Sequence, residues 1–319
     1  MNTKTRKRWR KFLLTVIILF SLLNLVAITQ AYHLTHFYEH GTVNSITEQT
    51  MSFWGKAKVA LIGLQQEKLV GAVPDSAYSN IKLKTADGLT LDAWLIKVPH
   101  AKGTVALFHG HGSEKSANLS QSNTFNQFGY STLLVDFRAH GQSEGNTCTV
   151  GYREAQDVKA AWDYLANTGE KNIILYGISL GAATVTKAIS DYHLQPEKVI
   201  LEMPFASLPA TVEGKMRMAG LPPEPLAGLL TFWGGSINGF WAFNMKPKEF
   251  VKQIKCPVLV QWGKKDKGVT EAEITGLFGN IRSQKKFVVY ENSGHENLCE
   301  NEPDKWEDTV EEFLGVNEQ

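Results

Sequence analysis

Cysteine is scarce in this sequence, and charge is missing from one long stretch of it. Three cysteines among 319 residues are too few for a disulfide scaffold. No aspartate, glutamate, lysine or arginine occurs from Phe12 to Tyr38, and no internal repeat or low-complexity tract appears anywhere. After residue 40 the chain is long enough to bury a sizeable core, in one large α/β domain or two small ones.

The charge that is present is unevenly distributed. Lysine and arginine number 33 and aspartate and glutamate 32, but residues 1–11 carry six basic side chains and no acidic one. The rest of the chain therefore sums to 27 − 32 = −5. An acidic body argues against a nucleic-acid partner, because duplex binding requires a basic face. With 43% hydrophobic residues, the body is also too apolar for intrinsic disorder.

The uncharged stretch contains a segment long enough to cross a bilayer. Residues 12–31 are mainly aliphatic, and about 20 apolar residues in a helix span the hydrocarbon core. We predict a cytoplasmic basic segment at 1–11, a transmembrane signal anchor at 12–31 and an extracytoplasmic body, which gives a single-pass protein of the cell membrane. The alternative is a signal peptide that is cleaved at the poor site Thr29-Gln30-Ala31, which would give a secreted protein.

Residues 32–77 carry no strong catalytic motif. Apolar residues at helical spacing between 46 and 70 predict a juxtamembrane helix. From residue 78 to 319, short runs of Val, Ile and Leu alternate with helical stretches. This alternation predicts a mainly parallel sheet with helices on both faces and an antiparallel hairpin at Asp87-Gly88 on one edge. We expect eight strands at 81–85, 89–98, 104–108, 130–135, 173–176, 199–201, 258–261 and 287–290, and helices at about 116–128, 151–167, 180–193, 271–282 and 304–314.

One pentapeptide carries the chemistry. Gly177-Ile178-Ser179-Leu180-Gly181 lies between an expected strand and an expected helix, the context in which G-x-S-x-G indicates a nucleophilic serine. The glycines leave room for a sharp turn, and the serine hydroxyl is exposed at the apex, in front of a helix N-terminus that favours negative charge. A serine hydroxyl also needs a base to remove its proton and an acid to orient that base.

The base and the acid are expected at the ends of later strands. In this topology the order is serine, acid, base. Asp266 follows the strand at 258–261, and His295 follows the strand at 287–290. Active sites in open α/β sheets gather at the carboxyl ends of the strands, so Ser179, Asp266 and His295 should converge.

Other residues are weaker candidates for the same roles. Glu202 also ends a strand and is the alternative acid, although a carboxylate bound to loop amides is the better interpretation. His109, His111 and His140 are alternative bases, but they precede the serine and belong to other loops, so we expect structural roles for them. A metal site at His109-x-His111 lacks a third ligand at typical spacing. The cysteines leave any pairing open, and they are Cys148, Cys256 and Cys299.

A tetrahedral intermediate needs hydrogen-bond donors for its oxyanion. One expected donor is the main-chain amide of Leu180, directly after the serine. The other is the main-chain amide of His111, or less favourably a neighbour in the same glycine-rich turn, which follows an early strand.

Taken together, these motifs resemble those of the α/β-hydrolase superfamily, from about Ile81 to the C-terminus. The His109-Gly110 turn, the segment 136–145, the serine pentapeptide and the loops that carry Asp266 and His295 occur in the family's order. The segment 136–145 is similar to the D-x-R-x-H-G-x-S-x-G stretch of esterase-, lipase- and acylaminoacyl-peptidase-like members, where it borders the site as a structural loop. The resemblance implies an α/β-hydrolase fold, hydrolysis through an acyl-enzyme, and no metal or organic cofactor.

Residues 205–250 lie where this family inserts a lid. The segment is rich in apolar residues, and a proline-rich stretch at 222–225 divides it. It forms either two helices that complete the core or a short cap over an apolar acyl pocket, and the two interpretations are compatible. The candidate substrate contacts are Phe205, Trp233, Phe240 and Trp241.

The sequence leaves three functions open. The first is a membrane-anchored esterase or lipase-like enzyme acting on a small-molecule or lipid ester, with a lipophilic acyl group expected. The second is a serine peptidase of the prolyl-oligopeptidase type, which uses the same order of residues but has a propeller domain that is missing here. The third is a non-enzymatic scaffold on a hydrolase fold, which the intact set of three residues disfavours. The oligomeric state stays open.

Overall fold

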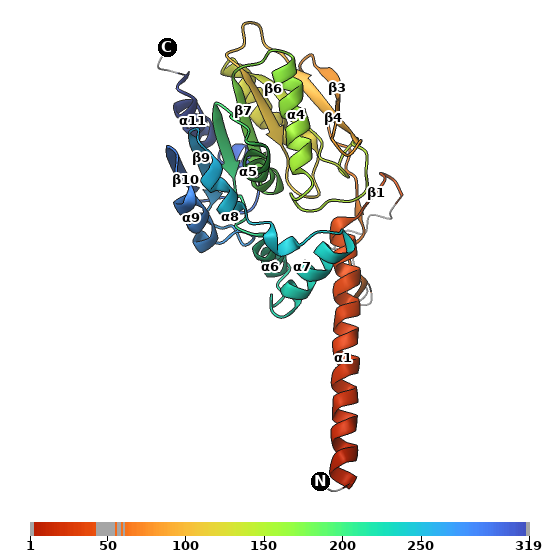
Figure 1. Ribbon diagram of the computed structural model, residues 1–319. Helices are drawn as coiled ribbons and strands as arrows, with labels where there is room; N and C mark the ends of the chain where they lie inside the picture. Colours follow the sequence, from red (N-terminus) through yellow and green to blue (C-terminus); the bar gives the residue numbers. More distant parts are fainter. Residues whose placement is uncertain (1–2, 43–54, 56–58, 60, 317–319) are drawn as a thin grey trace.

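A computed structural model of the chain describes residues 3–42, 55, 59 and 61–316 (Figure 1). Its body is built on an eight-stranded sheet with the order β10-β9-β8-β7-β5-β6-β4-β3. The strands β5 to β10 run parallel, whereas β4 pairs antiparallel with both β3 and β6. The strands are β3 (Ser79–Lys84), β4 (Thr90–Ile96), β5 (Thr104–Phe108), β6 (Ser131–Val135), β7 (Ile173–Ile178), β8 (Lys198–Glu202), β9 (Val258–Gly263) and β10 (Lys285–Tyr290).

Helices cover both faces of this sheet. On one face α3 (Leu119–Gln127) meets α11 (Pro303–Leu314), where the rings of Phe125 and Trp306 pack with centroids 5.7 Å apart. On the other face α4 (Ala155–Asn167) packs against α5 (Leu180–Tyr192), and α9 (Glu271–Asn280) packs nearer the β10 edge (Figure 1). The central strands are buried over their whole length because neither face of the sheet reaches solvent.

One predicted helix begins later than expected. We predicted a helix from residue 151, but α4 begins at Ala155. The carboxylate of Glu154 accepts hydrogen bonds from the amides of Thr149 and Gly151, at 2.8 and 2.7 Å. These bonds fold residues 149–154 into a turn, which Gly151 completes with a φ of 95°.

The connection from β8 to β9 forms a helical cap over one end of the sheet. It contains α6 (Leu208–Met218), α7 (Leu226–Ile237), η3 (Ala242–Asn244) and α8 (Pro247–Phe250). Two main helices separated at the proline-rich stretch are what the sequence predicted for this region. In Figure 1 the cap lies below the sheet, with α7 beside the upper part of α1 (Thr3–Thr35).

The helix α1 is continuous from the basic segment into the body. Within the described ranges it is the one helix that is long and apolar enough to cross a membrane, judged by length and composition. Its side chains from Phe12 to Leu22 are exposed, whereas Ala27 and Ala31 are buried against the cap. It ends at Thr35 and not at residue 31, so the apolar helix leads directly into the body.

The segment between α1 and the sheet differs from the prediction. Most of the helix expected at 46–70 falls outside the described residues. Leu61 and Ile62 are helical, but the helix does not reach residue 70, because β2 (Gln66–Glu67) pairs in parallel with β1 (Phe37–Tyr38). That part of the prediction is wrong, and tertiary pairing with β1 is the reason.

A buried ion cluster fixes the loop after β5 to the ends of β4 and β6. The Nζ atom of Lys115 lies 2.6 Å from Asp136 Oδ2 and 3.2 Å from Asp92 Oδ1. Asp136 Oδ1 also accepts from the Lys115 main-chain amide at 2.7 Å, and all three side chains are at most 2% exposed. Lys82 binds Asp92 as well, but its side chain is 60% exposed.

We therefore expect Lys115→Met to lower the free energy of unfolding by about 3–5 kcal/mol, because it leaves the Asp136 carboxylate buried without its cation. The matched control is Lys82→Met, which removes an exposed partner of the same cluster and should cost less than about 1 kcal/mol. Urea unfolding of the detergent-solubilised chain, followed by tryptophan fluorescence, measures both. Equal losses in the two variants would contradict this interpretation.

Candidate active site

Ser179 lies at the tight turn between β7 and α5. Its backbone has φ 51° and ψ −106°, a conformation that residues with a side chain rarely adopt. A Cβ atom on Gly177 would lie 2.4 Å from the carbonyl carbon of Gly181, and one on Gly181 would lie 2.1 Å from the carbonyl oxygen of Phe108. Both glycines of the pentapeptide are therefore required by close backbone contacts, as the sequence indicated.

His295 connects this serine to Asp266. Its Nε2 atom is 2.9 Å from Ser179 Oγ, and its Nδ1 atom is 2.7 Å from Asp266 Oδ2. The other oxygen of Asp266 accepts from the amides of Gly268 and Val269, at 2.7 and 2.9 Å. Because a carboxylate accepts, Nδ1 carries a proton and Nε2 is free to accept the proton of the serine hydroxyl. The structure thus brings together the three side chains that we expected to converge.

Glu202, the alternative acid, lies elsewhere. Its Oε1 atom accepts from the indole of Trp306 and from the amide of Gln261, the latter at 3.1 Å. No hydrogen bond or ion pair links it to His295 among the described residues, and burial raises the pKa of this carboxyl group to about 7. The hydrogen-bond partners of Glu202 are thus side chains and not the loop amides that we expected. Glu202 is a residue of the core.

Two of the alternative bases are structural as well. The Nε2 atom of His109 accepts from the amide of Phe137 at 3.1 Å, and that of His140 accepts from the amide of Gly112 at 3.2 Å. Burial lowers the pKa of His109 to about 4 and that of His140 to about 3. Both rings are therefore neutral at physiological pH and hold adjoining loops together.

His111 connects the site to α1, which the sequence did not indicate. Its Nε2 atom is 3.0 Å from the carbonyl oxygen of Leu34, in the last turn of α1, and its Nδ1 atom is 3.3 Å from Nζ of Lys215 on α6. A carbonyl accepts and an ammonium donates, so this ring is neutral with its proton on Nε2. Burial lowers the pKa of His111 well below its ordinary value, which agrees with that assignment.

The two predicted oxyanion donors belong to the walls of one cavity. His111 and Leu180 both line a cavity of about 420 Å³ together with Ser179 and His295. The amide of Leu180 is the first of α5, and amides in the first turn of a helix have no partner within the helix. This amide and the loop of His111 are thus on the same cavity as the serine hydroxyl.

The four residues predicted to contact the substrate do not line a single cavity. Phe205 lines the cavity of Ser179, and Phe240 lines a neighbouring, narrower slot. Trp233 and Trp241 line neither of these two spaces. The helical turn of α7 directs the indole N–H of Trp233 to Asn24 Oδ1 on α1, at 2.9 Å, and Trp241 is 55% exposed.

The slot is an apolar space between the end of α1 and the cap. Ala31 and Leu34 line it from α1, and Leu230 and Gly234 line it from α7. Apolar residues spaced in the sequence could not reveal it, because its walls come from helices about 200 residues apart. The slot and the main cavity share four wall residues, namely His111, Val150, Thr211 and Lys215.

The described part of the chain holds no group of three or more His, Cys, Asp or Glu side chains placed to bind a metal ion. Its three cysteines are free, and Cys148 and Cys299 are buried. The chemistry that can be derived from these residues is therefore that of the serine, the histidine and the aspartate.

Comparison with known proteins agrees with this architecture. The profile of a family described as serine aminopeptidase, S33, matches residues 99–234. An uncharacterized protein of Bacillus subtilis is 26% identical over 255 residues, which cover 78% of this chain and 80% of that protein. An esterase of Pyrococcus furiosus has a similar structure, with a TM-score of 0.67 and 24% identity over 78% of this chain and 96% of that chain. This chain therefore has the α/β-hydrolase fold.

These similarities confirm the fold predicted from the sequence, and the family match over residues 99–234 supports a hydrolase. A further relative of this hydrolase, described as an uncharacterized membrane protein of Saccharomyces cerevisiae, is 29% identical over 142 residues. That match covers 42% of this chain and 49% of the yeast protein.

The position of Glu202 in the hydrolase predicts a pH-dependent stability. The pKa of Glu202 in the folded protein, about 7, exceeds the ordinary value of 4.5. The contribution of its protonated carboxyl group to the free energy of unfolding is therefore complete below about pH 4.5 and is lost as the pH rises through 7. We expect Glu202→Gln to be more stable than the wild type at pH 8, by on the order of 3 kcal/mol. Near pH 4.5 this advantage should vanish. Thermal unfolding across this range, with the exposed Glu224→Gln as control, tests the assignment. A constant difference at every pH would refute it.

Proposed function

We propose that this protein is a membrane-anchored serine hydrolase that cleaves carboxylic esters with lipophilic acyl groups. The observation that carries the proposal is the hydrogen-bonded chain from Ser179 Oγ through His295 to Asp266, with both links shorter than 3 Å. Asp266 is fully buried, so its negative charge acts on the imidazole with little screening by water.

The reaction proceeds in two stages. Ser179 Oγ attacks the ester carbonyl while His295 Nε2 takes the hydroxyl proton, and Asp266 stabilises the imidazolium that forms. The main-chain amides of Leu180 and His111 donate to the oxyanion. His295 then gives its proton to the departing alcohol oxygen. A water molecule, deprotonated by the same nitrogen, attacks the acyl-serine. His295 then returns that proton to Ser179 Oγ as the acyl–oxygen bond breaks and the acid is released.

Two observations support a lipophilic acyl group. The wall of the main cavity includes the apolar side chains of Met203, Phe205 and Met218. The apolar slot then continues from this cavity along His111 and Lys215 toward α1. An acyl chain that follows this path is partly removed from water, which favours its binding by about 0.8 kcal/mol for each methylene group buried.

The contacts of α1 favour a retained anchor over a cleaved signal peptide. Ala27 and Ala31 are buried by the body, and Asn24 accepts a hydrogen bond from Trp233. Cleavage after Ala31 would remove these contacts and open one side of the slot. With residues 1–11 in the cytoplasm, the catalytic body lies on the outer side of the cell membrane.

Peptide hydrolysis is the second candidate, and the name of the matched family favours it. The same three residues cleave amides in other serine hydrolases. Parallel assays with a matched ester and amide, which differ only in the leaving group, separate the two functions. We expect turnover of the ester and little of the amide, and faster turnover of the amide would reverse the assignment.

We expect a fluorophosphonate probe to label the wild type and not Ser179→Ala. Asp266→Asn should lower kcat by roughly 10⁴-fold, because it leaves His295 with its proton on the wrong nitrogen. Asp304→Asn, on the exposed face of α11, is the matched control and should leave kcat unchanged. A non-enzymatic scaffold would give no labelling of the wild type, or equal labelling of Ser179→Ala.

The slot makes a prediction about acyl-chain length. Gly234 lines the slot, and a side chain at this position meets open space, as it does at Gly228 on the same helix outside the slot. We expect Gly234→Leu to lose turnover of the p-nitrophenyl ester of palmitate while keeping that of acetate. Gly228→Leu, which changes the helix in the same way, should keep both. Equal loss of the two esters in Gly234→Leu would remove the slot from the acyl path.

A further inference from the structure

We infer that the cap helix α7 lies within the bilayer, in the leaflet on the side of the catalytic body, where it contacts lipid beside α1. The inference rests on the proposed anchoring by α1 and adds a second embedded element. The bilayer is then the partner of the apolar surface of the cap. A lipid ester can reach the site from the bilayer without passing through water.

The depth of α7 follows from the length of the apolar run. Residues 12–31 span a hydrocarbon core of about 30 Å, at about 1.5 Å of rise for each residue. Trp233 of α7 binds Asn24, which lies seven residues before the end of this run, or about 10 Å below it. If the cap stayed above the bilayer, only residues 12–23 would remain for the lipid. They span about 18 Å, too little to cross.

The composition of the cap agrees with this depth. From residue 219 to residue 245, Glu224 is the single charged residue. Apolar side chains of this segment that reach the surface are Leu221 (51% exposed), Phe232 (39%), Ile237 (38%) and Trp241 (55%). A surface of this kind has no favourable partner in water, whereas lipid chains and the interfacial region suit aliphatic and tryptophan side chains.

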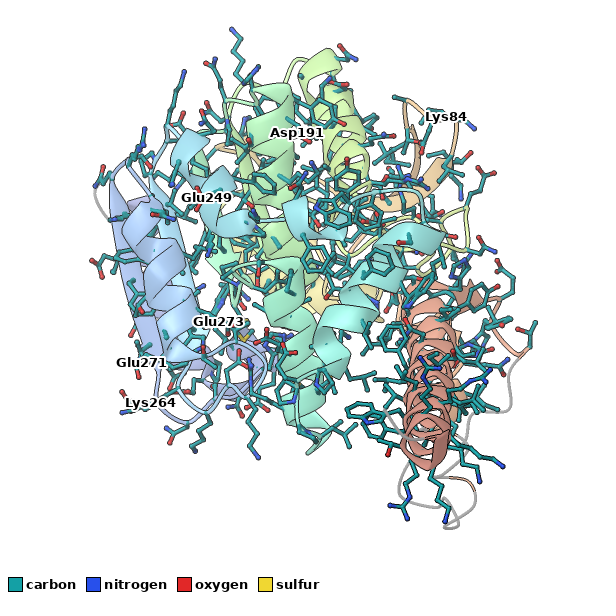
Figure 2. All side chains as sticks on the ribbon, turned by 60° about the horizontal axis from the view of Figure 1, so that its bottom comes forward. Lys84, Asp191, Glu249, Lys264, Glu271 and Glu273 are labelled. Carbon is teal, nitrogen blue, oxygen red and sulfur yellow. The ribbon has the colours of Figure 1, made fainter. Side chains whose placement is uncertain are left out.

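Two charged side chains of the body lie away from this surface. In Figure 2, which brings the lower end of the molecule forward, the labelled Lys264 and Glu271 lie at the opposite edge of the body from α1, with α7 between. The edge that carries Lys264 and Glu271 can therefore stay in water or among the headgroups while α7 enters the leaflet. At the C-terminal end of α7, the guanidinium group of Arg153 donates to the carbonyl of Asn238 at 2.7 Å.

The contact between the two helices is suited to an apolar medium. The indole N–H of Trp233 donates to Asn24 Oδ1, and the amide group of Asn24 donates to the carbonyl of Phe20 at 2.8 Å. The polar side chain in the middle of the run is thus paired on both its atoms, as lipid requires. The small side chains of Ala27 and Ala31 allow the cap to approach α1 closely.

The embedding can be measured in the full chain with an environment-sensitive fluorophore. Single cysteines at Leu19, Phe232 and Ala166, each in a Cys256→Ser background, are labelled with NBD and reconstituted in phosphatidylcholine vesicles. Native Cys148 and Cys299 are buried and do not compete. Leu19 is on the exposed part of α1, Phe232 on the surface of α7, and Ala166 on α4 at the far end of the body. Labelling of Ser179 by a fluorophosphonate checks that each variant is folded.

We expect NBD at Phe232 to emit at shorter wavelength than NBD at Ala166. It should be quenched by lipids with a doxyl group in the middle of the chain, whereas NBD at Leu19 is quenched most by doxyl groups near the methyl end of the chain. Quenching at Leu19 without quenching at Phe232 would overturn the inference and leave the anchor in place. No quenching at either position would overturn the anchor as well. Neither readout depends on ester turnover, so the result stands apart from the proposed reaction.

Discussion

The turn at Ser179 is the constraint on which the rest of the site depends. The chain passes from β7 to α5 with a positive φ at a residue that carries a side chain. That conformation costs on the order of 1–3 kcal/mol and persists because the surrounding backbone leaves no alternative. Gly177 and Gly181 fit between β7, α5 and the loop after β5 with no room for a Cβ atom. Once the turn is fixed, the serine hydroxyl meets His295, which follows β10, and His295 meets Asp266, which follows β9.

Local pattern was enough to predict this part of the structure. The strands consist of short aliphatic runs, the serine pentapeptide requires its two glycines, and parallel strands end at one edge. These relations hold between neighbours in the sequence or follow from topology, so the sheet and the positions of Ser179, Asp266 and His295 could be derived from the residues. Structural roles of His109 and His140 were also predicted, because both residues precede the serine and belong to other loops.

The interactions of the N-terminal helix could not be predicted in this way. The sequence indicated an apolar segment followed by a separate body, but Trp233 binds Asn24, Asn238 binds Thr35 at 3.2 Å, and His111 binds Leu34. These pairs join residues between 77 and 209 positions apart. No periodic pattern in the sequence around either residue predicts such a contact. For the same reason Trp233 was assigned to the substrate, whereas its indole N–H binds Asn24 of α1.

The hydrogen bond between Leu34 and His111 gives the N-terminal helix a second role. The last carbonyl groups of a helix have no partner within it, and here one of them is satisfied by the loop that carries a proposed oxyanion donor. The end of α1 is therefore a packed part of the body. In the proposed function the same helix is also the membrane anchor. An unrelated transmembrane segment in its place would keep that anchoring but would not supply this carbonyl to the loop of His111.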